Sequence, residues 1–152
     1  MLKAGDKAPA IELVDQHGAT FTLKGLGKRK VLVYFYPKAD TPGCTQQSCL
    51  LRDLVVSGVI GRTAIVGISP DTSAKQLKFD DKYSLGFPLL ADTEHVVAKA
   101  YKVWKKKSMY GREYMGIERS AFLIDGNGVI LHAWYKISPK DTPAHLLTAL
   151  GK

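Results

Sequence analysis

Six consecutive residues near the start of the chain constrain its fold more than any other stretch. Residues 31–36 read VLVYFY, a continuous β-branched and aromatic run that is typical of a central strand buried on both faces. Pro37 ends this strand, and the next segment, 42–57, repeats apolar residues at helical spacing, namely Leu50, Leu51, Leu54 and Val55. Gly58 supplies a helix stop. A buried strand followed by an amphipathic helix predicts an α/β protein.

Strand and helix patterns alternate along the rest of the chain. The stretch 10–23 predicts an opening hairpin with its turn at His17 and Gly18. The later segments predict a strand at 63–69, a helix at 72–83, a strand at 87–92, a helix at 93–104, an antiparallel hairpin at 120–135 and a helix near 139–150. Residues 105–118 have no clean period, so we expect a long loop there. We expect one domain, 1–152, with a central mixed sheet flanked by helices.

Composition and charge restrict the class of protein. Apolar residues make up 45% and charged residues 24%, which is ordinary for a globular protein. No signal-peptide core and no apolar run long enough to span a membrane is present, so we expect a cytoplasmic protein without a membrane partner. The net charge of +8 raises the question of nucleic acid, but no nucleic-acid motif accompanies the basic clusters 28–30 and 105–107. Solvated surface is the favoured interpretation, and DNA binding remains a weaker alternative.

Both cysteines lie in one short stretch, TPGCTQQSC, at residues 41–49. Thr41 is a good N-cap and Pro42 suits the first helical position, which makes Cys44 the third. A thiolate there faces unpaired backbone amides and the positive end of the helix dipole, and both favour its charged form. Cys44 is therefore a candidate nucleophile that needs no histidine, and the four histidines are indeed dispersed.

Cys49 permits more than one interpretation. On an ideal helix it lies about 140° around the axis from Cys44, because each residue advances by about 100°. A helical cysteine is often a small buried hydrophobe, and for Cys49 alone this alternative remains open. Two cysteines and scattered histidines are too few for a zinc site, so we expect no metal. The five-residue spacing also differs from the C-x-x-C of a thioredoxin-type dithiol.

The cysteine stretch resembles the peroxiredoxin motif P-x-x-x-T-x-x-C, which Pro37, Thr41 and Cys44 match. The second cysteine five residues on is similar to the bacterioferritin comigratory protein, or peroxiredoxin Q, branch of that family. GDKAPAIELVDQHGATFTL, IVGISPDTSA, FPLLAD and the stretch 103–130 also match that branch. The likeness thus covers nearly the whole chain.

The resemblance implies a thioredoxin-like fold with an N-terminal hairpin extension and thiol-dependent reduction of hydrogen peroxide and organic hydroperoxides. It implies Cys44 as the peroxidatic residue and Cys49 as the resolving residue, joined in a transient disulfide. Thioredoxin or a glutaredoxin-type donor would reduce that disulfide, with no cofactor. The branch is often monomeric.

The resemblance also assigns the supporting residues of the site. It implies Thr41 as a hydrogen-bond partner of thiolate and peroxide, Pro37 as part of the pocket and Arg119 as a distal guanidinium. Gln47 and Ala121 depart from the Glu and the Thr or Ser of many relatives, so a neutral amide replaces a carboxylate that could hold Arg119. The main alternative from another class is a redox sensor that signals to a partner without turnover.

Overall fold

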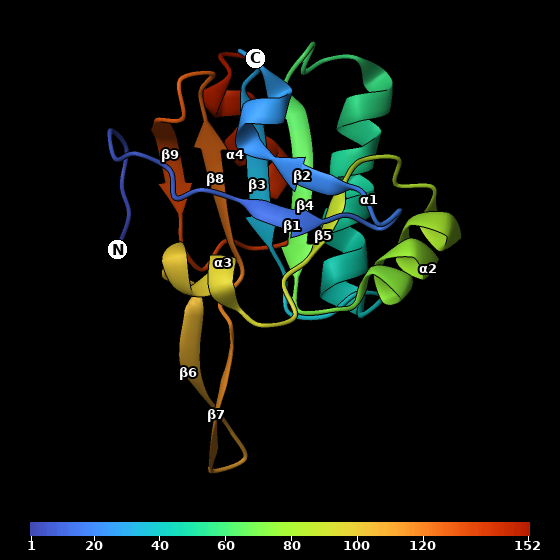
Figure 1. The fold of residues 1–152 in the computed structure, drawn as a ribbon, viewed down its shortest axis with the longest axis vertical. Helices are drawn as coiled ribbons and strands as arrows, with labels where there is room; N and C mark the ends of the chain where they lie inside the picture. Colours follow the sequence, from blue (N-terminus) through green and yellow to red (C-terminus); the bar gives the residue numbers. More distant parts are fainter.

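A five-stranded mixed sheet forms the centre of the computed structural model, which describes residues 1–152 (Figure 1). Its strands lie in the order β5-β4-β3-β8-β9. Their bounds are Val31–Phe35 for β3, Ala64–Ser69 for β4, Leu89–Ala91 for β5, Ser120–Ile124 for β8 and Ile130–Trp134 for β9. β3 pairs in parallel with β4 and antiparallel with β8, so the predicted buried strand is the middle of the sheet.

Helices cover both faces of this sheet. They are α1 (Pro42–Ser57), α2 (Ser73–Tyr83), α3 (Val96–Ala100) and α4 (Thr142–Ala149). Buried side chains of α1, α2 and α4 share one apolar cluster with Leu32 and Tyr34 of β3. Alternate β3 residues point to the opposite face, where α3 and the N-terminal segment close a second cluster.

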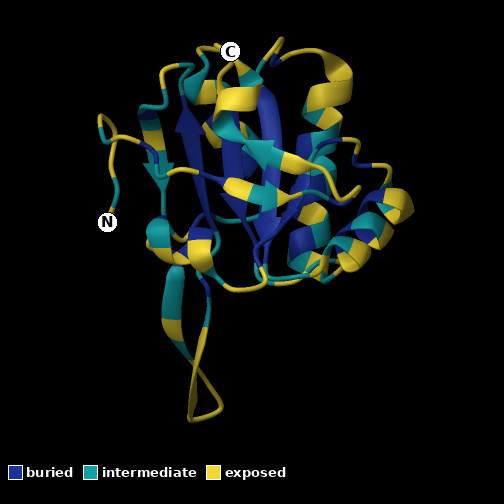
Figure 2. Cartoon of the chain, viewed as in Figure 1, coloured by how far each residue is buried: buried dark blue, intermediate teal, exposed yellow.

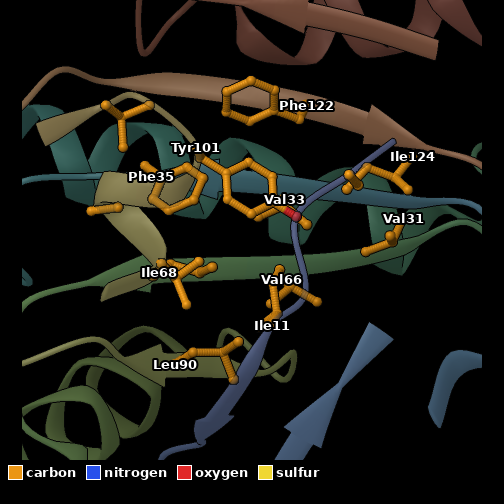
Figure 3. Packing of buried hydrophobic residues seen from close by; sticks show 14 of the residues in the cluster. Ile11, Val31, Val33, Phe35, Val66, Ile68, Leu90, Tyr101, Phe122 and Ile124 are labelled. Carbon is orange, nitrogen blue, oxygen red and sulfur yellow. The ribbon is translucent and has the colours of Figure 1, made fainter. Parts of the chain in front are cut away.

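The second cluster is built from large side chains of several strands (Figure 3). Phe35, Phe122 and Tyr101 meet there, with Phe35 and Phe122 edge to face at 5.9 Å between ring centroids. The predicted opening hairpin packs over this cluster. It is formed by β1 (Glu12–Val14) and β2 (Thr20–Thr22), and a 3-10 turn at Leu23–Leu26 follows it. The sheet, its flanking helices and this hairpin confirm the predicted architecture.

The segment expected to be a long loop is instead a second hairpin, and that prediction is wrong. β6 (Trp104–Met109) pairs antiparallel with β7 (Arg112–Ile117), and the pair projects from the body of the protein (Figure 1). Its turn places both Tyr110 and Gly111 at positive φ, 52° and 76°, as a two-residue type I′ turn requires. The usual Asn-Gly signature is absent, which hid the turn in the sequence.

The helix expected at 93–104 is much shorter, so that range was also wrong. α3 covers only Val96–Ala100, because His95 before it and Lys102 after it both have left-handed backbone conformations. Trp104 then starts β6. None of the helices is long and apolar enough to cross a membrane.

Candidate active site

Both cysteines lie on α1, which starts directly after the loop that follows β3. α1 begins at Pro42 with Thr41 as N-cap, and it ends at Gly58, whose φ of 77° is left-handed. Both boundaries agree with the sequence prediction. The Thr41 hydroxyl, however, makes no capping bond and instead donates to the carbonyl of Lys38 at 2.8 Å. Its proton is thus committed, so in this conformation Thr41 can accept a hydrogen bond but does not donate to Cys44.

The buried face of α1 differs from the predicted apolar stripe. Its buried residues are Cys44, Gln47, Ser48 and Leu51, whereas Val55 is exposed. Two of these four are polar, because Gln47 and Ser48 turn inward to make hydrogen bonds. Cys44 therefore lies in the middle of the buried face.

Arg119 lies beside the Cys44 sulfur. Its Nη2 is 3.2 Å from Cys44 Sγ, although the two residues are 75 positions apart. Arg119 sits between β7 and β8, and its carbonyl accepts from the backbone N–H of Ile137 at 2.9 Å. Cys44 is 1% exposed, so the Arg119 guanidinium places a permanent cation directly against a buried sulfur.

A buried glutamine fixes the guanidinium. Arg119 Nη1 donates to Gln47 Oε1 at 2.7 Å, and Gln47 Nε2 donates to Thr142 Oγ1 on α4 at 2.9 Å. The Thr142 hydroxyl donates in turn a hydrogen bond to the carbonyl of Ser138 at 2.8 Å. Arg119 has no carboxylate within ion-pair distance, so its positive charge stays directed at the sulfur.

Two further residues shape this contact. A Cβ at Gly43 would lie 3.3 Å from Arg119 Nη2, so the glycine leaves room for the guanidinium beside the helix. Behind the helix, the Tyr34 hydroxyl is 2.7 Å from Ser48 Oγ and ties α1 to β3. Burial raises the pKa of Tyr34 well above its ordinary value, so Tyr34 stays neutral and contributes packing without charge.

Cys49 lies further along the same unbroken helix as a half-buried free thiol. Arg52 Nη1 is 3.8 Å from its sulfur. On an ideal helix the Cα atoms of Cys44 and Cys49 lie roughly 8.5 Å apart, beyond the limit of about 7 Å for a disulfide. The two thiols therefore cannot bond while both stay in this helix.

The C-terminal end of α2 holds both sides of the cysteine segment. The Tyr83 hydroxyl donates to Asp40 Oδ1 at 2.7 Å, and the Tyr83 carbonyl accepts from Arg52 Nη1 at 2.6 Å. Lys82 Nζ adds an ion pair with Asp40 at 2.9 Å. We call this set of contacts, made by Lys82 and Tyr83 with Asp40 and Arg52, the Tyr83 clamp.

The remaining predicted residues lie around this centre without direct bonds to it. Pro37 is half-buried and lies two residues after the end of β3. Ala121 is fully buried on β8, opposite Tyr34, in the same apolar cluster as Cys44. Sequence reasoning missed Thr142 and the Tyr83 clamp, because nothing local in the sequence connects these residues to the cysteines. No group of three potential metal ligands is present.

Comparison with known proteins gives a consistent set of relatives. Residues 4–133 match the AhpC/TSA family. The chain is 45% identical over 149 residues to Peroxiredoxin Bcp of Bacillus subtilis, covering 98% of this chain and 95% of that protein. It is 46% identical over 133 residues to Peroxiredoxin Bcp of Escherichia coli, covering 88% and 85%.

Solved structures agree in fold. Peroxidoxin BcpB of Mycobacterium tuberculosis superimposes with a TM-score of 0.87 at 34% identity, over 99% of this chain and 97% of that one. The Xanthomonas campestris bacterioferritin comigratory protein, solved in a study of its alkyl peroxide reduction activity, superimposes with a TM-score of 0.86 at 32% identity, over 93% of this chain and 90% of that one. The predicted thioredoxin-like fold is confirmed by these neighbours.

Proposed function

The chain belongs to the AhpC/TSA family and is a peroxidase, and from this premise we propose that it reduces hydrogen peroxide and organic hydroperoxides through Cys44 and Cys49. The observation that carries the proposal is the 3.2 Å contact between Arg119 Nη2 and the buried Cys44 sulfur. A fixed cation beside a thiolate can also stabilise the oxyanion that leaves when a peroxide bond breaks. The alkyl peroxide activity named for the Xanthomonas campestris relative supports the inclusion of organic substrates.

The first proposed step oxidises Cys44. Its thiolate attacks the terminal peroxide oxygen, so an S–O bond forms while the O–O bond breaks. Cys44 becomes a sulfenic acid, and the leaving oxygen takes up a proton to give water or an alcohol. Thr41 is assigned to accept a hydrogen bond from the peroxide O–H, since its own hydroxyl already donates to the backbone carbonyl of Lys38. Pro37 is assigned to the wall of the pocket.

The second step requires α1 to open. Cys49 attacks the sulfenic sulfur, a disulfide forms and water leaves. Because the two sulfurs are separated by the intact helix, its first turns must unwind before this bond can form. An external dithiol of the thioredoxin or glutaredoxin type then reduces the disulfide by thiol exchange and leaves with its own cysteines oxidised.

The proposed setting is the cytoplasm, with a monomeric enzyme and no metal or other cofactor. A cycle that begins with free thiols needs a compartment that keeps cysteines reduced, and the cytoplasm does so. Two-electron exchange between sulfur and peroxide oxygen needs no further redox group.

Substitution of each cysteine tests the mechanism. Cys44→Ser should abolish peroxide reduction, because a serine hydroxyl supplies no comparable anion and forms no sulfenic acid. Cys49→Ser should consume one equivalent of peroxide and then stall unless a small thiol is added. Peroxide consumption measured with thioredoxin and its reductase separates these outcomes. Normal cycling by Cys49→Ser would rule out its resolving role, and a wild-type protein that stops after one equivalent would favour the sensor alternative.

A further inference from the structure

The β6–β7 hairpin exposes apolar side chains in an unusual concentration. Tyr110 is 97% exposed, Met109 55%, Met115 46% and Tyr114 43%. The hairpin stands clear of the body, and its tip is exposed throughout (Figure 2). Exposed apolar groups gathered on one projecting element indicate an interaction surface.

Strand pairing divides this hairpin into two different faces. Lys107 lies opposite Tyr114 and Met109 opposite Arg112, and residues paired across antiparallel strands share a face. One face therefore carries Lys105, Lys107, Met109, Arg112 and Tyr114. The other face carries Lys106 and Glu113, whose side chains form an ion pair at 3.1 Å. The first set, here called the cationic face, thus has three positive charges and no carboxylate.

The cationic face leads directly to the active site. The base of the hairpin is closed by the N–H of Glu118, which donates to the carbonyl of Val103 at 2.8 Å, and Arg119 is the next residue. Lys107 extends back toward this base, since its Cδ would lie 3.2 Å from a Cβ at Gly116. Burial, and then the positive charge of Arg119, lower the pKa of Lys107.

We propose that the cationic face of the β6–β7 hairpin docks the protein dithiol that reduces this enzyme, and that this partner presents carboxylates around an apolar contact beside its own cysteines. The inference rests on the proposed function, which requires such a reductant. None of the three cations of this face forms an ion pair, although Lys105 lies over the Tyr135 ring at 5.9 Å. With Met109 and Tyr114 beside them, they are complementary to an acidic rim around an apolar centre. The position also fits, because the reductant must reach the start of α1, which lies beside Arg119.

Other occupants fit the hairpin less well. A small peroxide has no use for an element that projects away from the site. A second copy of the chain would bring another cationic face and a net charge of +8 against the first, which is unfavourable. An acidic dithiol protein is therefore the occupant that the charges favour.

Charge reversal at Arg112 tests the proposal. Arg112→Glu should raise the KM for a thioredoxin of net negative charge about tenfold, and this effect should shrink in high salt. The peroxidase rate supported by dithiothreitol should stay within about twofold of wild type, since a small dithiol needs no docking surface. Tyr110→Ser, which removes the most exposed aromatic ring, should raise the same KM about threefold.

Arg62→Glu is the matched control, because it makes the same charge change at an exposed residue just before β4, at the opposite end of the sheet. Equal KM values for Arg112→Glu and Arg62→Glu would overturn the proposal, as would loss of the dithiothreitol-supported rate in Arg112→Glu. Arg112-dependent dimerisation, or binding to phosphatidylserine vesicles without a change in KM, would assign the face to another occupant. A wild-type protein inactive with both reductants would refute the proposed function itself.

Discussion

Arg119 divides its donors between two acceptors, and this division explains why a buried glutamine matters for a reaction at sulfur. One terminal nitrogen contacts Cys44 and the other contacts Gln47, which is held in turn by Thr142. A guanidinium can serve two acceptors at fixed angles because its donors form a rigid planar fork. Gln47 thus acts as a positioning residue for the cation.

Replacing Gln47 by leucine should slow the reaction with peroxide. Gln47→Leu keeps a side chain of similar size but leaves Arg119 Nη1 without its acceptor, so the guanidinium loses its fixed orientation. We expect the second-order rate constant with hydrogen peroxide to fall about tenfold near neutral pH.

Stopped-flow measurement of the peroxide reaction, with reduced Gln47→Leu and a reduced control variant, checks this prediction. Gln46→Leu is the control, because Gln46 is the neighbouring residue on the same helix but is exposed. A rate for Gln47→Leu equal to that of Gln46→Leu would show that Arg119 holds its position without the glutamine.

The chemistry-bearing residues differ in how far sequence could predict them. The position of Cys44 in the first turn of α1 was predictable because Pro42 favours the first helical position locally, although the Thr41 side chain makes no capping bond. Thr142 was not, since it meets Gln47 from 95 positions away. The buried face of α1 was predicted wrongly for a related reason. Two of its four buried residues, Gln47 and Ser48, are polar and make hydrogen bonds to distant residues.

At the scale of elements, α2 restrains α1, the helix whose first turns unwind in the proposed mechanism. The Tyr83 clamp contacts Asp40 before α1 and Arg52 within it, so it spans the segment that holds both cysteines. The hydrogen bond from Tyr83, and then the one from Lys82, lower the pKa of Asp40. Because the Asp40 pKa is lowered, the stabilisation that these contacts give is fully present above the ordinary pKa of an aspartate. It is lost as the pH falls through the lowered pKa of Asp40. The clamp is therefore complete at neutral pH.

Removal of the Tyr83 hydroxyl should loosen the cysteine segment. Tyr83→Phe deletes the bond to Asp40 while keeping the ring, and we expect disulfide formation after one equivalent of peroxide to accelerate about two- to threefold, a small factor because the contact is exposed. Amide exchange across residues 41–52 of the reduced protein should also accelerate, and hydrogen-exchange mass spectrometry measures this directly.

Tyr101→Phe is the matched control for the clamp. It also deletes a tyrosine hydrogen bond, to the Pro9 carbonyl at 2.7 Å, but on the other face of the sheet. If both variants left exchange at 41–52 unchanged, α1 would open without resistance from α2.

The elements that sequence analysis predicted wrongly lack a clear local signal for their type or their ends. The β6–β7 hairpin has polar or charged residues on both faces, so no apolar alternation marks its strands, and its Tyr-Gly turn resembles no common hairpin signal. α3 was overestimated because the left-handed residues that bound it, His95 and Lys102, are not glycines. The strands of the central sheet and the helices α1, α2 and α4 were predictable because their inner residues face a core.

At the scale of the whole molecule, the sheet separates the part that moves in the proposed mechanism from the part that stays in place. α1 packs only on the cluster that contains Leu32 and Tyr34, whereas the N-terminal hairpin and α3 close the opposite cluster. Opening the first turns of α1 therefore disturbs one face and leaves the other intact. The alternation of strands and helices in sequence could predict this layering, but not which face would yield.

A comparison of two buried leucines in two redox states tests this division. Leu51 of α1 and Leu90 of β5 are both 0% exposed, and they belong to opposite clusters. Leu51→Ala and Leu90→Ala should each lower the free energy of unfolding of the reduced protein by about 2–5 kcal/mol. In the disulfide form Leu90→Ala should keep its full cost, whereas the cost of Leu51→Ala should fall to less than half, because unwinding of about residues 41–52 already exposes that side chain. The disulfide also restricts the unfolded chain, but equally in each variant and its parent, so that contribution cancels in the differences. Urea unfolding of the wild-type protein and of both variants, each in the reduced and the disulfide form, measures these costs. An undiminished cost of Leu51→Ala in the oxidised protein, with the Cys44 to Cys49 bond established by peptide mapping, would mean that the disulfide forms without releasing α1 from the sheet.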